Sequence, residues 1–105
     1  MKNKPDYLGH RQRLMEKYRK TGLSGWHDYE ILEFILTFVI PIRDTKPAAR
    51  SLLRKFGSFG EVFNAGEKEL IEVRGIGPRS AVLLGLLREV QLMQLCGAER
   101  MAEKG

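Results

Sequence analysis

Hydrophobic residues recur along the chain at helical spacing, and no stretch alternates polar and apolar positions as a half-buried strand does. No Asn-Gly or Asp-Gly pair marks a tight β-hairpin. The pattern therefore predicts an all-α fold, a compact bundle of about five to six helices. The predicted helices run over about residues 8–21, 28–39, 45–56, 59–64, 67–73 and 78–96.

The second and the last predicted helices carry much of the expected core. The second is apolar nearly all round, which is typical of a central helix, and its apolar residues are Ile31, Leu32, Phe34, Ile35, Leu36, Phe38 and Val39. The last helix is expected to pack through a face made of Ala81, Leu83, Leu84, Leu87, Val90, Gln91 and Leu95. In the first helix, Leu14 and Tyr18 are expected on the side away from its basic residues.

Local signals mark where several helices begin. Asp28 is suited to cap the second helix, and Asp44 or Thr45 is suited to cap the third. Ser58 and Glu61 form a capping box for the short helix that follows.

A weak internal repeat relates two parts of the chain at a spacing of 31 residues. Residues 42–47 match residues 73–78, and a Leu-Leu pair follows each of them at the same distance. Both stretches consist of an apolar residue, Arg, a tight turn, Pro and then a helix. The repeat suggests two helix–turn–helix units that pack as a pair.

Length and composition limit the class of protein. The 105 residues, 43% of them hydrophobic, suffice for one domain with a core, which we expect over residues 1–97, with 98–105 as a tail leading to a further domain. The one cysteine, Cys96, excludes an intramolecular disulfide framework and a Cys-rich zinc site. No apolar run reaches the roughly 20 residues of a membrane span, and no apolar stretch follows the basic N-terminus as in a secretory signal. We therefore expect a cytoplasmic protein with no membrane partner.

The positive charge is concentrated at one end of the chain. The net charge is +5, and residues 1–20 alone hold seven Lys and Arg against two acids, which accounts for the whole excess. Four basic side chains of the first predicted helix, at i, i+3, i+7 and i+10, share one face: His10, Arg13, Lys17 and Lys20. A basic face on an otherwise neutral body favours contact with nucleic acid. The alternative is an ordinary solvated helix face.

The segment Arg74-Gly75-Ile76-Gly77-Pro78 carries the clearest chemistry in the sequence. Its glycines allow backbone conformations closed to other residues and lack the Cβ that would keep a ligand away. Ile76 is apolar inside a turn, so we expect it to tuck between the flanking helices. The first amides of the helix that follows have no intrahelical partner and lie at the positive end of its dipole. Such amides form an anion site.

Side chains beside this turn are candidates to add hydrogen-bond donors to a phosphate oxygen. The predicted phosphate-binding set is therefore Arg74, Gly75, Ile76, Gly77, Arg79 and Ser80. A plain helix–helix connection is the alternative, because Gly-X-Gly by itself is common. The dinucleotide fingerprint is excluded, because no strand precedes the turn and no third glycine falls at the required spacing.

Residues 70–84 closely resemble the helix-hairpin-helix motif. In that family the hairpin amides and the start of the following helix hold the DNA phosphate backbone without reading sequence. The resemblance implies this role for Gly75, Ile76, Gly77, Arg79 and Ser80. It implies no cofactor, except that such hairpins sometimes hold a monovalent cation through backbone carbonyls.

A longer series of motifs occurs in order along the chain: Gly9-His10-Arg11-Gln12-Arg13-Leu14, Asp28-Tyr29-Glu30-Ile31-Leu32-Glu33, Ile40-Pro41-Ile42-Arg43-Asp44-Thr45-Lys46-Pro47, Phe56-Gly57-Ser58 and Gly75-Ile76-Gly77-Pro78. Together they resemble the N-terminal helical domain of the RadC family, the UPF0758 group, historically named as DNA repair proteins. The match covers roughly residues 7–95. It implies a bacterial-type cytoplasmic protein with tandem helix-hairpin-helix units, similar to the second domain of the Holliday-junction protein RuvA.

The chain departs from that family in two ways. RadC-like proteins usually continue into a zinc-dependent JAB/MPN metallopeptidase-like domain, and this chain has no closely spaced His pair or acidic-His signature, so we expect no enzyme here. The first half of the repeat has Asp44-Thr45-Lys46 where the second has Gly75-Ile76-Gly77. We interpret it as a degenerate, structural hairpin, with Arg43 and Lys46 as secondary DNA contacts.

Other polar and aromatic residues have simpler interpretations. Capping and helix solubility explain Asp28, Glu30 and Glu33. Trp26 is expected to cover an edge of the core, with stacking on a base as the alternative. Cys96 is interpreted as a packing residue, because no base can be assigned to it.

The leading hypothesis is a nonenzymatic module that binds duplex or branched DNA through its phosphates, independently of sequence. The Gly75–Gly77 turn would be its main contact, and the basic face of the first helix would add affinity. The alternative is a protein-interaction module that docks and positions the metallopeptidase-like domain absent from this chain.

Overall fold

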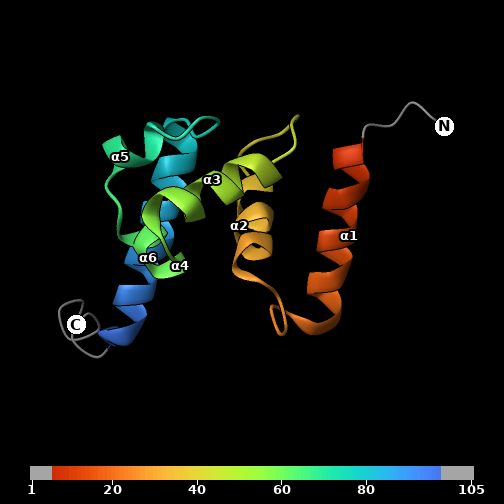
Figure 1. Cartoon of the computed structure of the whole chain (residues 1–105). Coiled ribbons are helices and arrows are strands. Elements are labelled where there is room, and N and C mark those ends of the chain that lie inside the picture. The colour runs from red at the N-terminus through yellow and green to blue at the C-terminus, as the bar shows by residue number, and fades with distance from the viewer. Residues whose placement is uncertain (1–5, 98–105) are drawn as a thin grey trace.

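The computed structural model describes residues 6–97, and all regular structure in that range is helical (Figure 1). The helices are α1 (Asp6–Thr21), α2 (Asp28–Thr37), α3 (Lys46–Phe56), α4 (Phe59–Asn64), α5 (Glu67–Ile71) and α6 (Pro78–Leu95). The predicted all-α fold is therefore confirmed for this range. Within it, no helix has both the length and the hydrophobicity that crossing a membrane requires. The predicted tail, residues 98–105, lies outside the described residues.

The main core lies where α2 and α3 pack against each other and where α4 joins them to α5 and α6. Five helices each contribute a fully buried side chain to it: Leu36, Leu52, Val62, Leu70 and Leu84. The predicted central position of α2 is confirmed, because this helix packs against both α1 and α3. The core therefore holds α2 to α6 together as one body.

α1 stands at one side of the molecule and packs against α2 (Figure 1). Leu14, Trp26 and Phe34 form a second buried cluster there, with the ring centroids of Trp26 and Phe34 5.5 Å apart. Trp26 is thus a core residue, as expected, and its buried ring is not available for stacking on a base. The placement predicted for Leu14 is wrong, because this residue shares its side of α1 with His10 and Lys17 at spacings of i, i+4 and i+7.

Arg11 ties α1 to the end of α2. Its guanidinium donates to the carbonyl oxygens of Thr37 at 2.9 Å, of Ile40, and of Arg43 at 2.6 Å. The last carbonyls of a helix have no intrahelical partner, so one side chain satisfies acceptors of both α2 and the connection to α3. Sequence reasoning gave Arg11 no structural role, since composition does not distinguish it from the neighbouring exposed cations.

The start of α2 differs from the prediction. His27, not Asp28, is the N-cap residue, and the Glu30 carboxylate accepts the His27 N–H at 3.0 Å. Asp28 is the first residue of the helix, where a carboxylate still lies at the favourable end of the dipole.

The predicted starts of α3 and α4 are confirmed, and of the capping box predicted for α4 the structure has the bond to the Ser58 side chain. Thr45 is the N-cap residue of α3, and the Asp44 carboxylate accepts the N–H of Lys46 at 2.9 Å, so both candidate residues serve this helix. Ser58 caps α4 by accepting the N–H of Glu61 at 3.2 Å. Local hydrogen bonds therefore determine where α3 and α4 begin.

α6 continues beyond the body to which its first half is attached (Figure 1). The prediction that its apolar residues pack through to Leu95 is wrong. Buried residues are confined to the first half of the helix, at Ser80, Ala81 and Leu84, whereas Leu95 is 76% exposed. The contribution of α6 to the main core ends at Leu84, so helical periodicity alone overstated its packing.

The buried positions of α3 and α6 match at a spacing of 32 residues, not at the predicted spacing of 31. Buried pairs at that spacing are Ala48 with Ser80, Ala49 with Ala81 and Leu52 with Leu84, and the N-cap residues Thr45 and Gly77 follow the same spacing. Aligning the two prolines gives a spacing of 31, but Pro47 is the second residue of α3 and Pro78 is the first residue of α6. The helices themselves therefore align at a spacing of 32. The chain thus contains two helix–turn–helix pairs, α2–α3 and α5–α6, joined by α4.

Candidate nucleic-acid interface

The turn between α5 and α6 is fixed by one left-handed residue. Gly75 has a φ of +92°, a conformation that other residues rarely adopt. A Cβ placed on it would lie 3.5 Å from the Cβ of Ala48, so the turn rests against α3. The bend therefore has a defined shape and a defined place on the body.

Ile76 anchors the same turn from within. Its side chain is 4% exposed and belongs to the main core, and its N–H donates to the Val73 carbonyl at 3.0 Å. The expectation that this apolar residue tucks between the helices is confirmed. Burial of Ile76 leaves the flanking glycines at the rim of the core.

The backbone donors at the start of α6 have no acceptor in the described part of the chain. Gly77 is the N-cap residue, with extended backbone angles, and the first helical N–H to find a partner is that of Ala81, which donates to the Gly77 carbonyl at 3.0 Å. The N–H groups of Gly75, Gly77, Arg79 and Ser80 find no acceptor among residues 6–97. They therefore lie without an internal partner at the positive end of an 18-residue helix, a position that favours an anion.

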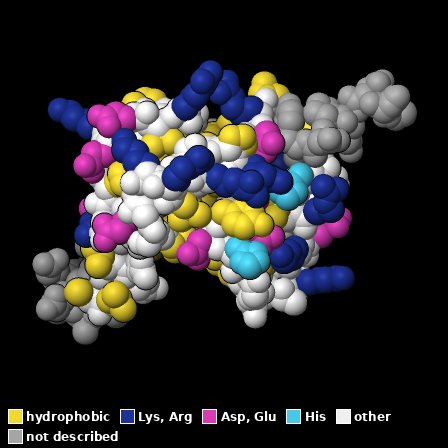
Figure 2. Space-filling view, in the orientation of Figure 1, with side chains coloured by type: hydrophobic (Ala, Val, Ile, Leu, Met, Phe, Trp, Pro, Cys, Tyr) yellow, Lys and Arg dark blue, Asp and Glu magenta, His cyan; other side chains and the backbone are white. Residues whose placement is uncertain are grey.

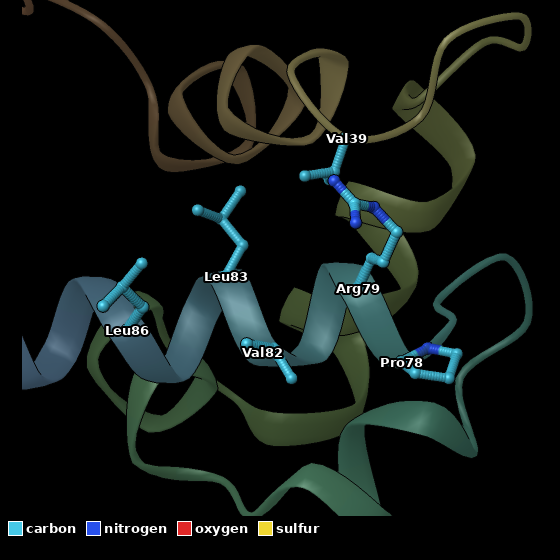
Figure 3. Close-up of a pocket in the computed structure, with 6 residues that line it drawn as sticks. All are labelled: Val39, Pro78, Arg79, Val82, Leu83 and Leu86. Carbon is cyan, nitrogen blue, oxygen red and sulfur yellow. The ribbon is translucent and has the colours of Figure 1, made fainter.

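The side chains predicted to donate to a phosphate differ in their exposure. Arg74 and Arg79 are exposed, whereas Ser80 is 3% exposed, so its hydroxyl is a poorer donor to a ligand than expected. Figure 3 shows Arg79 extending from the first turn of α6 toward Val39, across an apolar groove and away from Pro78. The structure brings Arg79 close to the end of α2 rather than over the turn.

The first turn of the repeat is occupied by the protein's own groups. The Asp44 carboxylate accepts the Lys46 N–H, and the Arg43 carbonyl accepts from Arg11. The Thr45 hydroxyl donates to the Glu33 carbonyl at 3.1 Å inside the core. These bonds agree with its interpretation as a structural hairpin, while the side chains of Arg43 and Lys46 carry no ion pair among the described residues.

The predicted basic face of α1 is divided between α2 and solvent. His10 Nε2 lies 3.4 Å from Glu33 Oε1, and Lys17 Nζ lies 3.2 Å from Glu30 Oε2. Arg13 and Lys20, the other two members of this face, are exposed. Two of the four predicted contacts thus hold α1 to α2 in this structure.

The acidic residues of α2 are part of its packing. Glu33 is 1% exposed, so the prediction that it serves helix solubility is wrong; its place inside the apolar run 31–36 was the available signal. The capping role expected for Glu30 is confirmed. The His27 N–H lowers the pKa of Glu30, partial burial opposes this, and Lys17 lowers the pKa further.

Comparison with curated proteins finds relatives of the chain. A UPF0758 protein of Fusobacterium nucleatum subsp. nucleatum is 46% identical over 85 residues. These residues make up 81% of the chain but 37% of the relative, so the chain spans little more than a third of the length of that protein. No family model matches the chain, and no solved structure matches it.

Proposed function

The chain belongs to the UPF0758 family over the 81% of its length that matches, and from this premise we propose that it binds the phosphate backbone of DNA without reading the base sequence. The site is the turn at Gly75–Gly77 together with the first turn of α6. The role in DNA repair and the cytoplasmic location that the RadC resemblance implies belong to the same proposal.

The observation that carries the proposal is the set of amides at the start of α6 that lack an acceptor among residues 6–97. Gly75 and Ile76 give the turn that carries these amides a fixed shape. Phosphate oxygens are suitable acceptors for such amides, and the absence of a Cβ at Gly77 permits close approach. Contacts of this kind position a protein on DNA but carry no sequence information.

The charges beside the turn support the same ligand. Arg74 flanks the turn and is exposed, Arg79 is exposed on the first turn of α6, and Arg13 and Lys20 add positive charge on α1. Affinity from phosphate contacts falls with salt, because each contact releases counterions. Engagement of roughly three to five phosphates predicts a slope of about −3 to −4.5 for log K against log salt.

A fluorescence titration of the folded chain tests the proposal, with duplex, four-way-junction and single-stranded DNA at two salt concentrations. We expect weak, sequence-tolerant binding that strengthens at low salt. A folded protein that shows no response to any of these DNAs at low salt would contradict it.

Docking of another protein domain is the second candidate function, and the free half of α6 favours it. Apolar side chains along this second half are exposed: Val90, Leu92, Met93 and Leu95. The metallopeptidase-like domain implied by the RadC resemblance is the partner to test. Chemical-shift changes on α6 when that domain is added, together with no response to DNA, would support docking over DNA binding.

A further inference from the structure

We propose that the outer face of α3 is a second phosphate-binding surface, formed by Lys46, Arg50 and Arg54. This inference rests on the proposed function, since the ligand is the same nucleic acid that the turn at Gly75–Gly77 binds. We call these three residues the α3 stripe. It extends the site to Arg50 and Arg54, which the sequence patterns did not single out.

The sequence of α3 separates apolar and cationic residues sharply. Its 11 residues include four Lys and Arg and no carboxylate. Ala48, Ala49 and Leu52 face the core, and the α3 stripe lies on the opposite side at i, i+4 and i+8. At a rise of 1.5 Å per residue the stripe is about 12 Å long, enough to follow several phosphates along a strand.

The fold pairs two of the carboxylates that balance these charges in the sequence with basic side chains of α1. Residues 21–66 hold five cations and five acids, yet Glu33 is buried against His10 and Glu30 pairs with Lys17. Among residues 6–97 no carboxylate lies within ion-pair distance of the α3 stripe. Lys55, on another side of α3, is instead paired with Glu72 at 2.9 Å. A segment that is neutral in sequence therefore presents an unbalanced positive face.

Arg50 is held in place before any ligand arrives. Its guanidinium lies over the ring of Tyr29, 5.1 Å from the ring centroid, and Tyr29 stacks in parallel with His27 at 5.7 Å. A guanidinium that lies over a ring uses its face for that contact, and the N–H donors at its edge stay free to reach phosphate oxygens. The ordering of this long side chain reduces the entropy lost on binding.

The α3 stripe and the turn belong to the same rigid part of the fold but face different directions. Gly75 touches α3 at Ala48, on the inner side of the helix, whereas the stripe is on the outer side. In Figure 2 the Lys and Arg side chains gather over α3 and extend toward α1 on the visible face. Two separate phosphate contacts on one body suit a duplex, which presents two backbones, better than a short single strand.

Neutralisation of the stripe tests this inference. The variant K46Q/R50Q/R54Q is titrated with duplex DNA over a range of salt concentrations, beside a control, R19Q/K68Q/R88Q, that removes the same charge from α1, α5 and α6. We expect the slope of log K against log salt to become shallower by about 2 to 3 in the stripe variant, and its affinity at low salt to fall about tenfold or more. The control variant is expected to keep a slope close to that of the wild type.

Two further variants separate this inference from the proposed function. Arg50→Lys keeps the charge and should retain the wild-type slope, which shows that the triple variant acts through charge. A folded stripe variant with an unchanged slope, tested beside a Gly77→Asp variant that loses affinity, would overturn the stripe and leave the turn. The reverse result would overturn the turn and support the stripe. Circular dichroism confirms in each case that the variant is folded.

Discussion

The guanidinium of Arg11 in α1 donates to the carbonyl oxygen of Thr37, the last residue of α2, at 2.9 Å. The same group reaches the carbonyl of Arg43 at 2.6 Å. A cation at a helix C-terminus meets the negative end of the dipole and satisfies carbonyls that lack an intrahelical partner. One residue of α1 thus stabilises both the end of α2 and the turn that precedes α3.

Loss of this side chain is expected to destabilise the fold. Arg11→Met keeps a long apolar stem but leaves the part-buried carbonyls of Thr37 and Ile40 and the exposed carbonyl of Arg43 without this donor. The free energy of unfolding should therefore fall by about 2–3 kcal/mol. Arg13→Met, at an exposed position of the same helix, should change it by less than about 0.5 kcal/mol. Urea unfolding measures both. Equal effects of the two substitutions would contradict the role of Arg11.

Gly77→Asp is expected to raise stability and lower DNA affinity at the same time. Gly77 has N-cap geometry and nothing lies within 4 Å of an added Cβ, so an Asp side chain fits. Its carboxylate would accept from the amides at the start of α6 and stabilise the protein by about 0.5 kcal/mol. The same carboxylate would occupy the phosphate site and reduce affinity about tenfold or more. Thermal unfolding and DNA titration measure the two effects.

A second glycine provides the matched control for this substitution. Gly66 is the N-cap residue of α5, also with extended backbone and with no atom closer than 3.9 Å to an added Cβ. Gly66→Asp adds the same charge at another helix start, so its effect on DNA affinity should be less than about threefold in physiological salt. Equal losses of affinity in both variants would mean that net charge, not the turn, determines binding.

Gly75 and Gly77 are expected to respond differently to a larger side chain. Gly75→Val forces a β-branched residue into a left-handed conformation against Ala48, and should lower the free energy of unfolding by about 2 kcal/mol or more. Gly77→Val meets open space and an ordinary backbone, so its cost is limited to a poorer cap, about 1 kcal/mol or less. Chemical denaturation distinguishes them. A larger loss at Gly77 would contradict the geometry of the turn.

Those parts of the fold that depend on local chemistry could be predicted from the sequence. The turn at Gly75–Gly77, the burial of Ile76 and the cap at Ser58 each follow from a few neighbouring residues. Their backbone donors and conformational limits are the same in any surrounding fold. The helical character of the chain follows for the same reason.

Features that depend on which helices meet could not be predicted in this way. Periodicity identifies apolar residues of α6 but not the point where its partners end, so Leu95 was wrongly assigned to the core. It likewise does not show that Glu33 lies against His10 of another helix, or that Lys46, Arg50 and Arg54 of α3 have no ion-pair partner among residues 6–97. Each of these facts requires the relative positions of two helices.

The stability of the α1–α2 contact is expected to depend on pH through Glu30. The His27 N–H and Lys17 hold the pKa of Glu30 below its ordinary value of 4.5 in the folded protein. A lowered folded-state pKa means that the stabilisation is fully present above the unfolded-state pKa and is lost as pH falls through the folded-state pKa. Glu30→Gln removes the charge but keeps an oxygen that can accept the His27 N–H.

Unfolding measured from pH 7 down to pH 3 tests this expectation. The wild type should be more stable than Glu30→Gln at neutral pH, and the difference should shrink on acidification below the ordinary pKa of the carboxyl group. A difference that stays constant or widens toward acid pH would contradict the assigned cause of the shift.

Two leucines of α6, two residues apart, test which side of the helix the core covers. Leu84 is fully buried and Leu86 is 53% exposed. Leu84→Ala leaves a cavity and should lower the free energy of unfolding by about 2–5 kcal/mol. Leu86→Ala removes an exposed side chain from a helix that tolerates Ala well, so the change should be below about 0.5 kcal/mol.

The pair also distinguishes a free helix face from a covered one. If the side of α6 that carries Leu86 were covered within the protein, Leu86→Ala should cost nearly as much as Leu84→Ala. If another copy of the chain covers that face, the cost of Leu86→Ala should grow with protein concentration, because association stabilises the folded state by mass action. Urea unfolding at two protein concentrations measures both effects. We expect a small, concentration-independent effect at Leu86 and a large one at Leu84, because Leu86 is exposed whereas Leu84 is fully buried in the main core.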